Sequence, residues 1–171
     1  FAPAVAIPAR LRSHFDAQDV LESGAADLYG ARDGWLNRAL AASGDRRGLA
    51  VGTQTPLVMR GAVRTGSWSP AGAAASDERV VAALMDLYAG DAELGPALTE
   101  GLEGEIAAAA ATDGLALRRG DVEGLGAAVA RFMTAPDGPD VVTLSLDGYD
   151  THARQGAARG QLATRLGLQD L

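Results

Sequence analysis

A short apolar run in the last third of the chain constrains the fold most strongly. Residues 141–146 read Val-Val-Thr-Leu-Ser-Leu and lie between Pro139 and Gly148. A near-continuous apolar run with β-branched residues is typical of a strand that is covered on both faces, as in the parallel sheet of an α/β domain. The sequence therefore predicts a buried strand over 141–146 and an α/β fold in which a mostly parallel sheet is flanked by helices.

Two acids and a histidine follow this strand. Asp147, Asp150 and His152 fall within six residues of one another. In open α/β sheets, chemistry collects at the carboxyl ends of the strands. Two carboxylates and an imidazole suit a divalent cation such as Zn²⁺, Mn²⁺ or Mg²⁺, and we interpret this strand end as a site for a metal ion or a charged oxyanion. The spacing is equally compatible with Asp150 capping the next helix and His152 lying in its first turn.

The other histidine of the chain lies near the N-terminus. Residues 4–7 form a short apolar run that Pro8 ends, which predicts a strand. Ser13 then has the pattern of a helix N-cap, and Gly24 that of a C-cap. Ser13 and His14 would lie at the helix N-terminus, where free N–H groups favour anions and activated nucleophiles. The simpler alternative is that Ser13 is only a cap and that the acids at positions 16, 19 and 22 form a solvated face.

The rest of the chain alternates between helix and strand patterns. Short strands are predicted over 48–52 and 56–60, paired as a hairpin, and residues 61–72 are predicted to be a loop. Helices are predicted over 34–40, capped by Asp33, and over 77–88, capped by Ser76. Three more helices are expected over 91–111, 121–134 and 155–170, the second with a core face of Val122, Leu125, Val129, Phe132 and Met133.

Charge and composition exclude several functions. The net charge of −7 and the absence of a basic stripe argue against a nucleic-acid partner. The chain has no cysteine, which removes disulfides, zinc–thiolate sites and cysteine nucleophiles. It contains no apolar run of about 18 residues, so the sequence predicts no membrane span.

Two phrases of the sequence resemble a known family. Residues 12–24, Arg-Ser-His-Phe-Asp-Ala-Gln-Asp-Val-Leu-Glu-Ser-Gly, are similar to the RSHF-x-AQD-x-x-E-x-G signature of the bacterial domain of unknown function 1501 family. Residues 147–152, Asp-Gly-Tyr-Asp-Thr-His, are similar to the GGWDTH signature of that family. Residues 33–38 and 56–61 also resemble family segments in the expected order.

The family is grouped with the alkaline phosphatases and sulfatases. The resemblance implies one alkaline-phosphatase-like α/β domain over 1–171, with a metal site at the strand ends. It implies Asp150 and His152 as metal ligands, with Asp147 either a third ligand or a residue at the rim, since the family has glycine there. It also implies, by placement alone, that Ser13 is the nucleophile and that His14 or Arg12 contacts the transferred group.

The sequence differs from the family pattern at its ends. Family members have an upstream glycine- and Asp-containing strand end and a downstream Thr-Asp-His-Gly segment, and neither occurs in these 171 residues. We therefore expect an internal portion of a longer bacterial protein, incomplete at both ends, and export to the periplasm is implied only by the resemblance. Two functions are compatible with these residues: a metal-dependent hydrolase of small anionic phosphate or sulfate esters, or a non-catalytic binding or scaffolding domain with at most a partial metal site.

Overall fold

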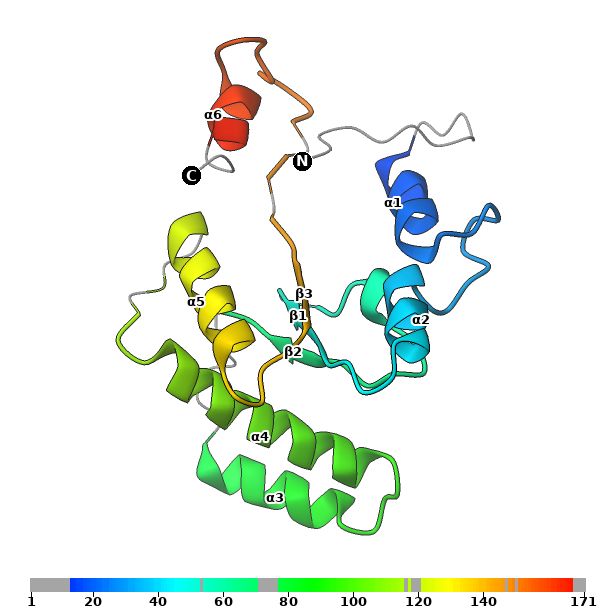
Figure 1. Ribbon diagram of the computed structural model, residues 1–171, viewed down its shortest axis with the longest axis vertical. Helices are drawn as coiled ribbons and strands as arrows, with labels where there is room; N and C mark the ends of the chain where they lie inside the picture. Colours follow the sequence, from blue (N-terminus) through cyan, green and yellow to red (C-terminus); the bar gives the residue numbers. More distant parts are fainter. Residues whose placement is uncertain are drawn as a thin grey trace. The chain divides into compact units, whose positions relative to one another are not determined.

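The chain has a mixed α/β structure. The computed structural model describes residues 13–52, 54–70, 77–115, 117, 121–146, 148–149 and 151–167. In these ranges six α-helices accompany a small three-stranded parallel sheet that is flanked by helices, which confirms the predicted class (Figure 1). An alkaline-phosphatase-like fold stays a prediction. The predicted strand over 4–7 and the predicted site residues Arg12, Asp147 and Asp150 lie outside the described residues.

The described residues form two compact units. The first contains those of 1–67 and 139–143, and the second those of 68–138 and 144–171. The first unit carries most of the sheet together with two helices, and the second unit carries the remaining four helices. The single domain expected over 1–171 stays a prediction.

The sheet differs in part from the sequence prediction. Its strands are β1 (Gly48–Val51), β2 (Gly66–Trp68) and β3 (Val141–Leu144), in the order β2-β1-β3. The patterns predicted β1 and the position of β3, whereas β2 lies in a segment predicted to be a loop. The prediction of a buried strand over 141–146 is wrong in its burial and its end, since the first three residues of β3 are half-buried and its last residue, Leu144, is exposed. The predicted strand over 56–60 is wrong, since Leu57–Met59 form the 3₁₀-helix η1, and the predicted hairpin is therefore wrong too.

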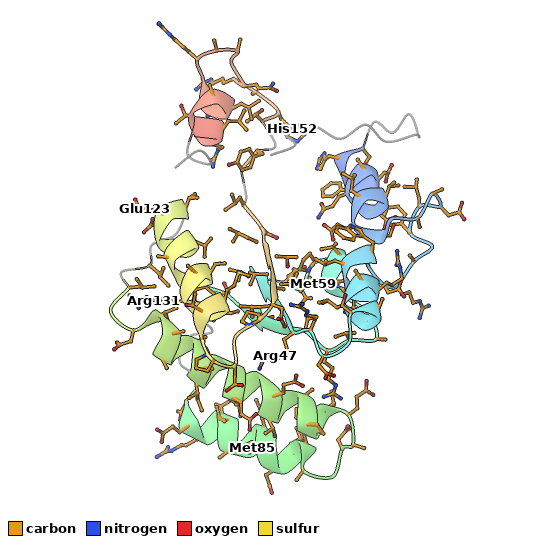
Figure 2. All side chains as sticks on the ribbon, viewed as in Figure 1. Arg47, Met59, Met85, Glu123, Arg131 and His152 are labelled. Carbon is orange, nitrogen blue, oxygen red and sulfur yellow. The ribbon has the colours of Figure 1, made fainter. Side chains whose placement is uncertain are left out.

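A small apolar core holds the first unit together. The helix α2 (Trp35–Ala42) contributes Leu40, β1 contributes Ala50 and η1 contributes Met59, and all three are buried. Met59 is labelled in Figure 2. Partly buried side chains surround this cluster: Leu36, Val58, Val63 and Val141. Since β1 and η1 share this core with α2, Met59 is buried and Val58 is partly buried without the segment pairing as a strand.

A buried asparagine ties α2 to the loop that follows η1. The Asn37 side chain is 1% exposed, and its Nδ2 donates hydrogen bonds of 2.8 Å to the carbonyl oxygens of Met59 and Val63. Its Oδ1 accepts a hydrogen bond of 3.1 Å from the Val63 N–H. A methyl group built on Gly61 would overlap this Oδ1, and one built on Gly34 would overlap the backbone of η1. Glycine is therefore required at both positions by close approach of neighbouring groups.

The N-terminus of α2 lies one residue later than predicted. Gly34, not Asp33, is the N-cap, and no side-chain hydrogen bond caps this helix. Asp33 Oδ1 instead accepts a hydrogen bond of 2.6 Å from Arg38 Nη1, and Arg38 Nη2 donates one of 2.6 Å to the Ser23 carbonyl oxygen. Arg38 thus joins α2 to the end of the preceding helix, α1 (His14–Ser23).

The second unit is built from helices. These are α3 (Glu78–Tyr88), α4 (Leu94–Thr112), α5 (Val122–Thr134) and α6 (Gln161–Gly167), and α4 lies beside both α3 and α5 (Figure 1). Asp77 caps α3 in place of the predicted Ser76, which lies outside the described residues. The predicted core face of α5 is confirmed at Phe132, which packs edge-on against Trp68, but is wrong at Met133, which is exposed.

One carboxylate joins the starts of β1 and β3. Asp140 Oδ2 accepts a hydrogen bond of 2.9 Å from the Arg47 N–H, and Oδ1 accepts one of 3.0 Å from Arg46 Nη1. In return, the Arg47 carbonyl oxygen accepts hydrogen bonds from the N–H groups of Asp140 and Val141. The hydrogen bond from the Arg47 N–H, aided by Arg46, holds the pKa of Asp140 below its ordinary value of 3.8.

The lowered pKa of Asp140 predicts that this residue contributes to the loss of folding stability at acidic pH. The pKa of Asp140 is lower in the folded state than in the unfolded state. The Asp140 carboxylate therefore stabilises the fold at pH values above the unfolded-state pKa, and this stabilisation is lost as the pH falls through the folded-state pKa. We expect Asp140→Asn to flatten the fall in the free energy of unfolding below about pH 4. Urea denaturation at a series of pH values measures this, with Asp45→Asn as an exposed, charge-matched control. Parallel acid profiles for Asp140→Asn and the unmodified protein would contradict the assignment.

Candidate functional site

Ser13 and His14 open the helix α1, as the sequence predicted. Ser13 has extended backbone angles, and its Oγ accepts a hydrogen bond of 3.3 Å from the Asp16 N–H. Gly24 ends the helix in the left-handed conformation, with φ of 67°. His14 is exposed, and its ring centroid lies 4.1 Å from that of Phe15. The cap role of Ser13 is confirmed, and a role as nucleophile stays a prediction.

The acids of α1 have specific partners that the interpretation as a solvated face did not foresee. Asp16 Oδ1 accepts a hydrogen bond of 2.5 Å from the Tyr29 hydroxyl, and Asp19 Oδ2 accepts one of 2.7 Å from the Tyr29 N–H. Glu22 Oε2 accepts one of 3.1 Å from the N–H of Val58 in η1. These carboxylates fasten α1 to the following loop and to η1.

Tyr29 is a residue of this region that sequence reasoning missed. It is 64% exposed and has a φ of 55°, a conformation that is uncommon for residues other than glycine. The hydrogen bond to the Asp16 carboxylate raises the pKa of its hydroxyl, because ionisation would place two negative charges side by side. The hydroxyl therefore remains a donor beside the helix N-terminus.

The segment after β3 carries the other predicted site residues. Gly148 has a φ of 94°, and His152 is exposed in the loop between β3 and α6 (Figure 2). In the part of the chain that the structure describes, no group of three acids, histidines or cysteines could hold a metal ion. Since Asp147 and Asp150 lie outside that part, the ligand set of Asp147, Asp150 and His152 stays a prediction.

Asp150 lies outside the described residues, so its alternative role as a helix cap stays a prediction. The helix α6 begins at Gln161, and residues 151–160 form bends and irregular backbone. His152 is accordingly in a loop and not in the first turn of a helix. Positive φ angles at Arg154, Gly156 and Gly160 interrupt the helix that was predicted from residue 155.

Ser13 and His152 belong to different compact units. Ser13 lies in the first unit and His152 in the second. The structure brings Ser13 and His14 together at one helix N-terminus, with Asp16 and Tyr29 beside them. A composite site formed by Ser13 and His152 stays a prediction.

Comparison with known proteins gives no match. No protein-family profile matches the chain, and neither a curated protein nor a solved structure is similar to it. The resemblance to the domain of unknown function 1501 family therefore stays a prediction. Among the helices of the described residues, none has the length and apolar character needed to cross a membrane.

Proposed function

We propose that the chain carries catalytic elements of a metal-dependent hydrolase of phosphate or sulfate esters. The observation that carries the proposal is the placement of the Ser13 hydroxyl at the first turn of α1, where it meets the Asp16 N–H. Free N–H groups and the helix dipole at such a position favour an anionic group. In this hypothesis Ser13 attacks the ester or orients its anion, and His14 or Arg12 contacts the transferred group.

The second part of the proposal concerns the residues after β3. Two carboxylates and an imidazole, from Asp147, Asp150 and His152, are donors that suit Zn²⁺, Mn²⁺ or Mg²⁺. His152 lies in an exposed loop after β3. A divalent metal bound there would polarise an ester oxygen.

Metal content tests this proposal. Mass spectrometry of the purified protein, after incubation with Zn²⁺ or Mn²⁺ and removal of free ions, should find close to one metal ion per chain. Asp150→Asn should reduce that occupancy by about tenfold or more, because it removes a charged ligand. Asp86→Asn on the exposed side of α3 is the matched control and should retain the metal. Equal occupancy in both variants, or no metal in any of the proteins, would reject the metal site.

The second candidate function is a non-catalytic binding or scaffolding domain. It is favoured by the structural roles of the polar groups on α1: Ser13 caps the helix, and Asp16, Asp19 and Glu22 hold neighbouring segments. A protein that binds no metal and hydrolyses neither p-nitrophenyl phosphate nor p-nitrophenyl sulfate would support this alternative.

A further inference from the structure

The helix α3 has apolar side chains on more than one side. It lies beside α4 in the second unit (Figure 1), and its half-buried residues are Val81, Leu84 and Tyr88, which recur at helical spacing. A helix that is apolar on several sides is normally buried, yet no residue of α3 is buried. A second apolar face of α3 is therefore in contact with solvent.

This second face consists of Val80, Ala83 and Leu87. Their spacing of three and four residues places them in one row along the helix, which we call the outer strip. All three residues are exposed, Val80 by 51% and Leu87 by 70%. Ala83 lies in the middle of the row, and its small side chain permits close approach of another helix.

Two opposite charges flank the outer strip along one edge. Arg79 and Asp86 are seven residues apart, which places them on the same side of the helix, and both are exposed. In the sequence, no position three or four residues from either of them carries an opposite charge. The helix α3 itself therefore gives neither charge the stabilising pair that neighbours one turn apart can form.

We propose that the outer strip is the contact surface for a second copy of the chain, with two α3 helices packed antiparallel around Ala83. A two-fold symmetric interface uses the same patch on both copies, so the patch must be complementary to itself. In the antiparallel arrangement Arg79 of one copy meets Asp86 of the other at both ends of the contact, and Val80 meets Leu87. A parallel arrangement would instead bring equal charges to the same level, which is unfavourable.

Sedimentation equilibrium of the full chain, whose monomer has a mass of 17.4 kDa, tests the proposal. One helix from each copy gives an interface of less than standard size, so we expect a weak dimer and a concentration series from about 5 to about 500 µM. Leu87→Glu should raise the Kd of dimerisation by about tenfold or more, because it places a carboxylate in the apolar contact. Met85→Glu is the matched control and should change the Kd by less than about twofold, since Met85 is an exposed residue on the other side of α3.

Charge reversal tests the antiparallel arrangement. Arg79→Asp and Asp86→Arg should each raise the Kd by about fivefold or more at low salt, because like charges then meet at both ends of the contact. An equimolar mixture of these two variants should restore dimerisation, since every charge again meets an opposite one. Asp45→Arg, an exposed residue of the first unit, controls for net charge and should change the Kd by less than about twofold. Circular dichroism checks that each variant keeps its helices.

Three outcomes would overturn the proposal. They are a monomer at every concentration, a dimer that Leu87→Glu leaves intact, and a mixture of the charge-reversed variants that associates no more tightly than each variant alone. Because the contact uses none of the predicted site residues, these measurements do not depend on the proposed function.

Discussion

Replacing Asn37 with alanine is expected to lower the free energy of unfolding by about 3–5 kcal/mol. The side chain is almost completely buried and makes three hydrogen bonds to the backbone around η1. Alanine would remove all three hydrogen bonds, and the Met59 carbonyl oxygen would keep only the one of 3.3 Å from the Thr65 hydroxyl. Each buried group left unsatisfied costs about 1–3 kcal/mol. The core residue Met59 lies in this segment, so the loss extends to the packing of the first unit.

Urea denaturation followed by circular dichroism measures this loss. Ser43→Ala is the matched control at the C-cap of the same helix, because Ser43 is exposed and its hydroxyl donates to the Ala39 carbonyl oxygen in the preceding turn. That change should cost less than about 0.5 kcal/mol. Asn37→Asp should be as damaging as alanine, because a carboxylate would face two carbonyl oxygens. A loss below about 1 kcal/mol for Asn37→Ala would show that the segment reorganises or binds water.

Sequence patterns predicted the elements whose signals are local. The N-cap Ser13 and the C-cap Gly24 both lie at the ends of α1, and the apolar runs predicted β1 and β3. These signals succeed because capping and apolar periodicity act within one or two turns of the residue that carries them.

Elements that depend on distant partners were not predictable. Residues 56–60 have the composition of a strand, yet Leu57–Met59 form a 3₁₀-helix in which Met59 packs with Leu40 of α2. A short apolar run is compatible with either structure until its neighbours are known. The strand β2 has only three residues, one of them glycine, and it forms because β1 lies beside it.

The residues of the candidate site also divide into those with a local sequence signal and those that meet only through tertiary structure. Ser13 and His152 could be selected from sequence because each belongs to a recognisable phrase. Tyr29 meets Asp16 through a left-handed turn. This contact leaves no periodic signal, since side chains that meet through tertiary structure have no fixed spacing in the chain.

The largest effect on activity is expected at Ser13. If its hydroxyl is the nucleophile, Ser13→Ala should reduce the hydrolysis of phosphate or sulfate esters by about 10³-fold or more. The same change removes the hydrogen bond from the Asp16 N–H and should lower the free energy of unfolding by about 1 kcal/mol. Alanine alone therefore cannot distinguish a nucleophile from a helix cap.

Two further substitutions separate these roles. Ser13→Asp keeps a good N-cap but removes the hydroxyl, so stability should be retained while activity is lost. Ser13→Thr keeps both the cap and a hydroxyl, so it should retain stability and a measurable part of the activity. The readouts are urea denaturation and initial rates with p-nitrophenyl phosphate and p-nitrophenyl sulfate in the presence of Zn²⁺ or Mn²⁺. If activity follows stability through the series, with Ser13→Asp as active as the unmodified protein, Ser13 is a cap and the nucleophile must be sought elsewhere.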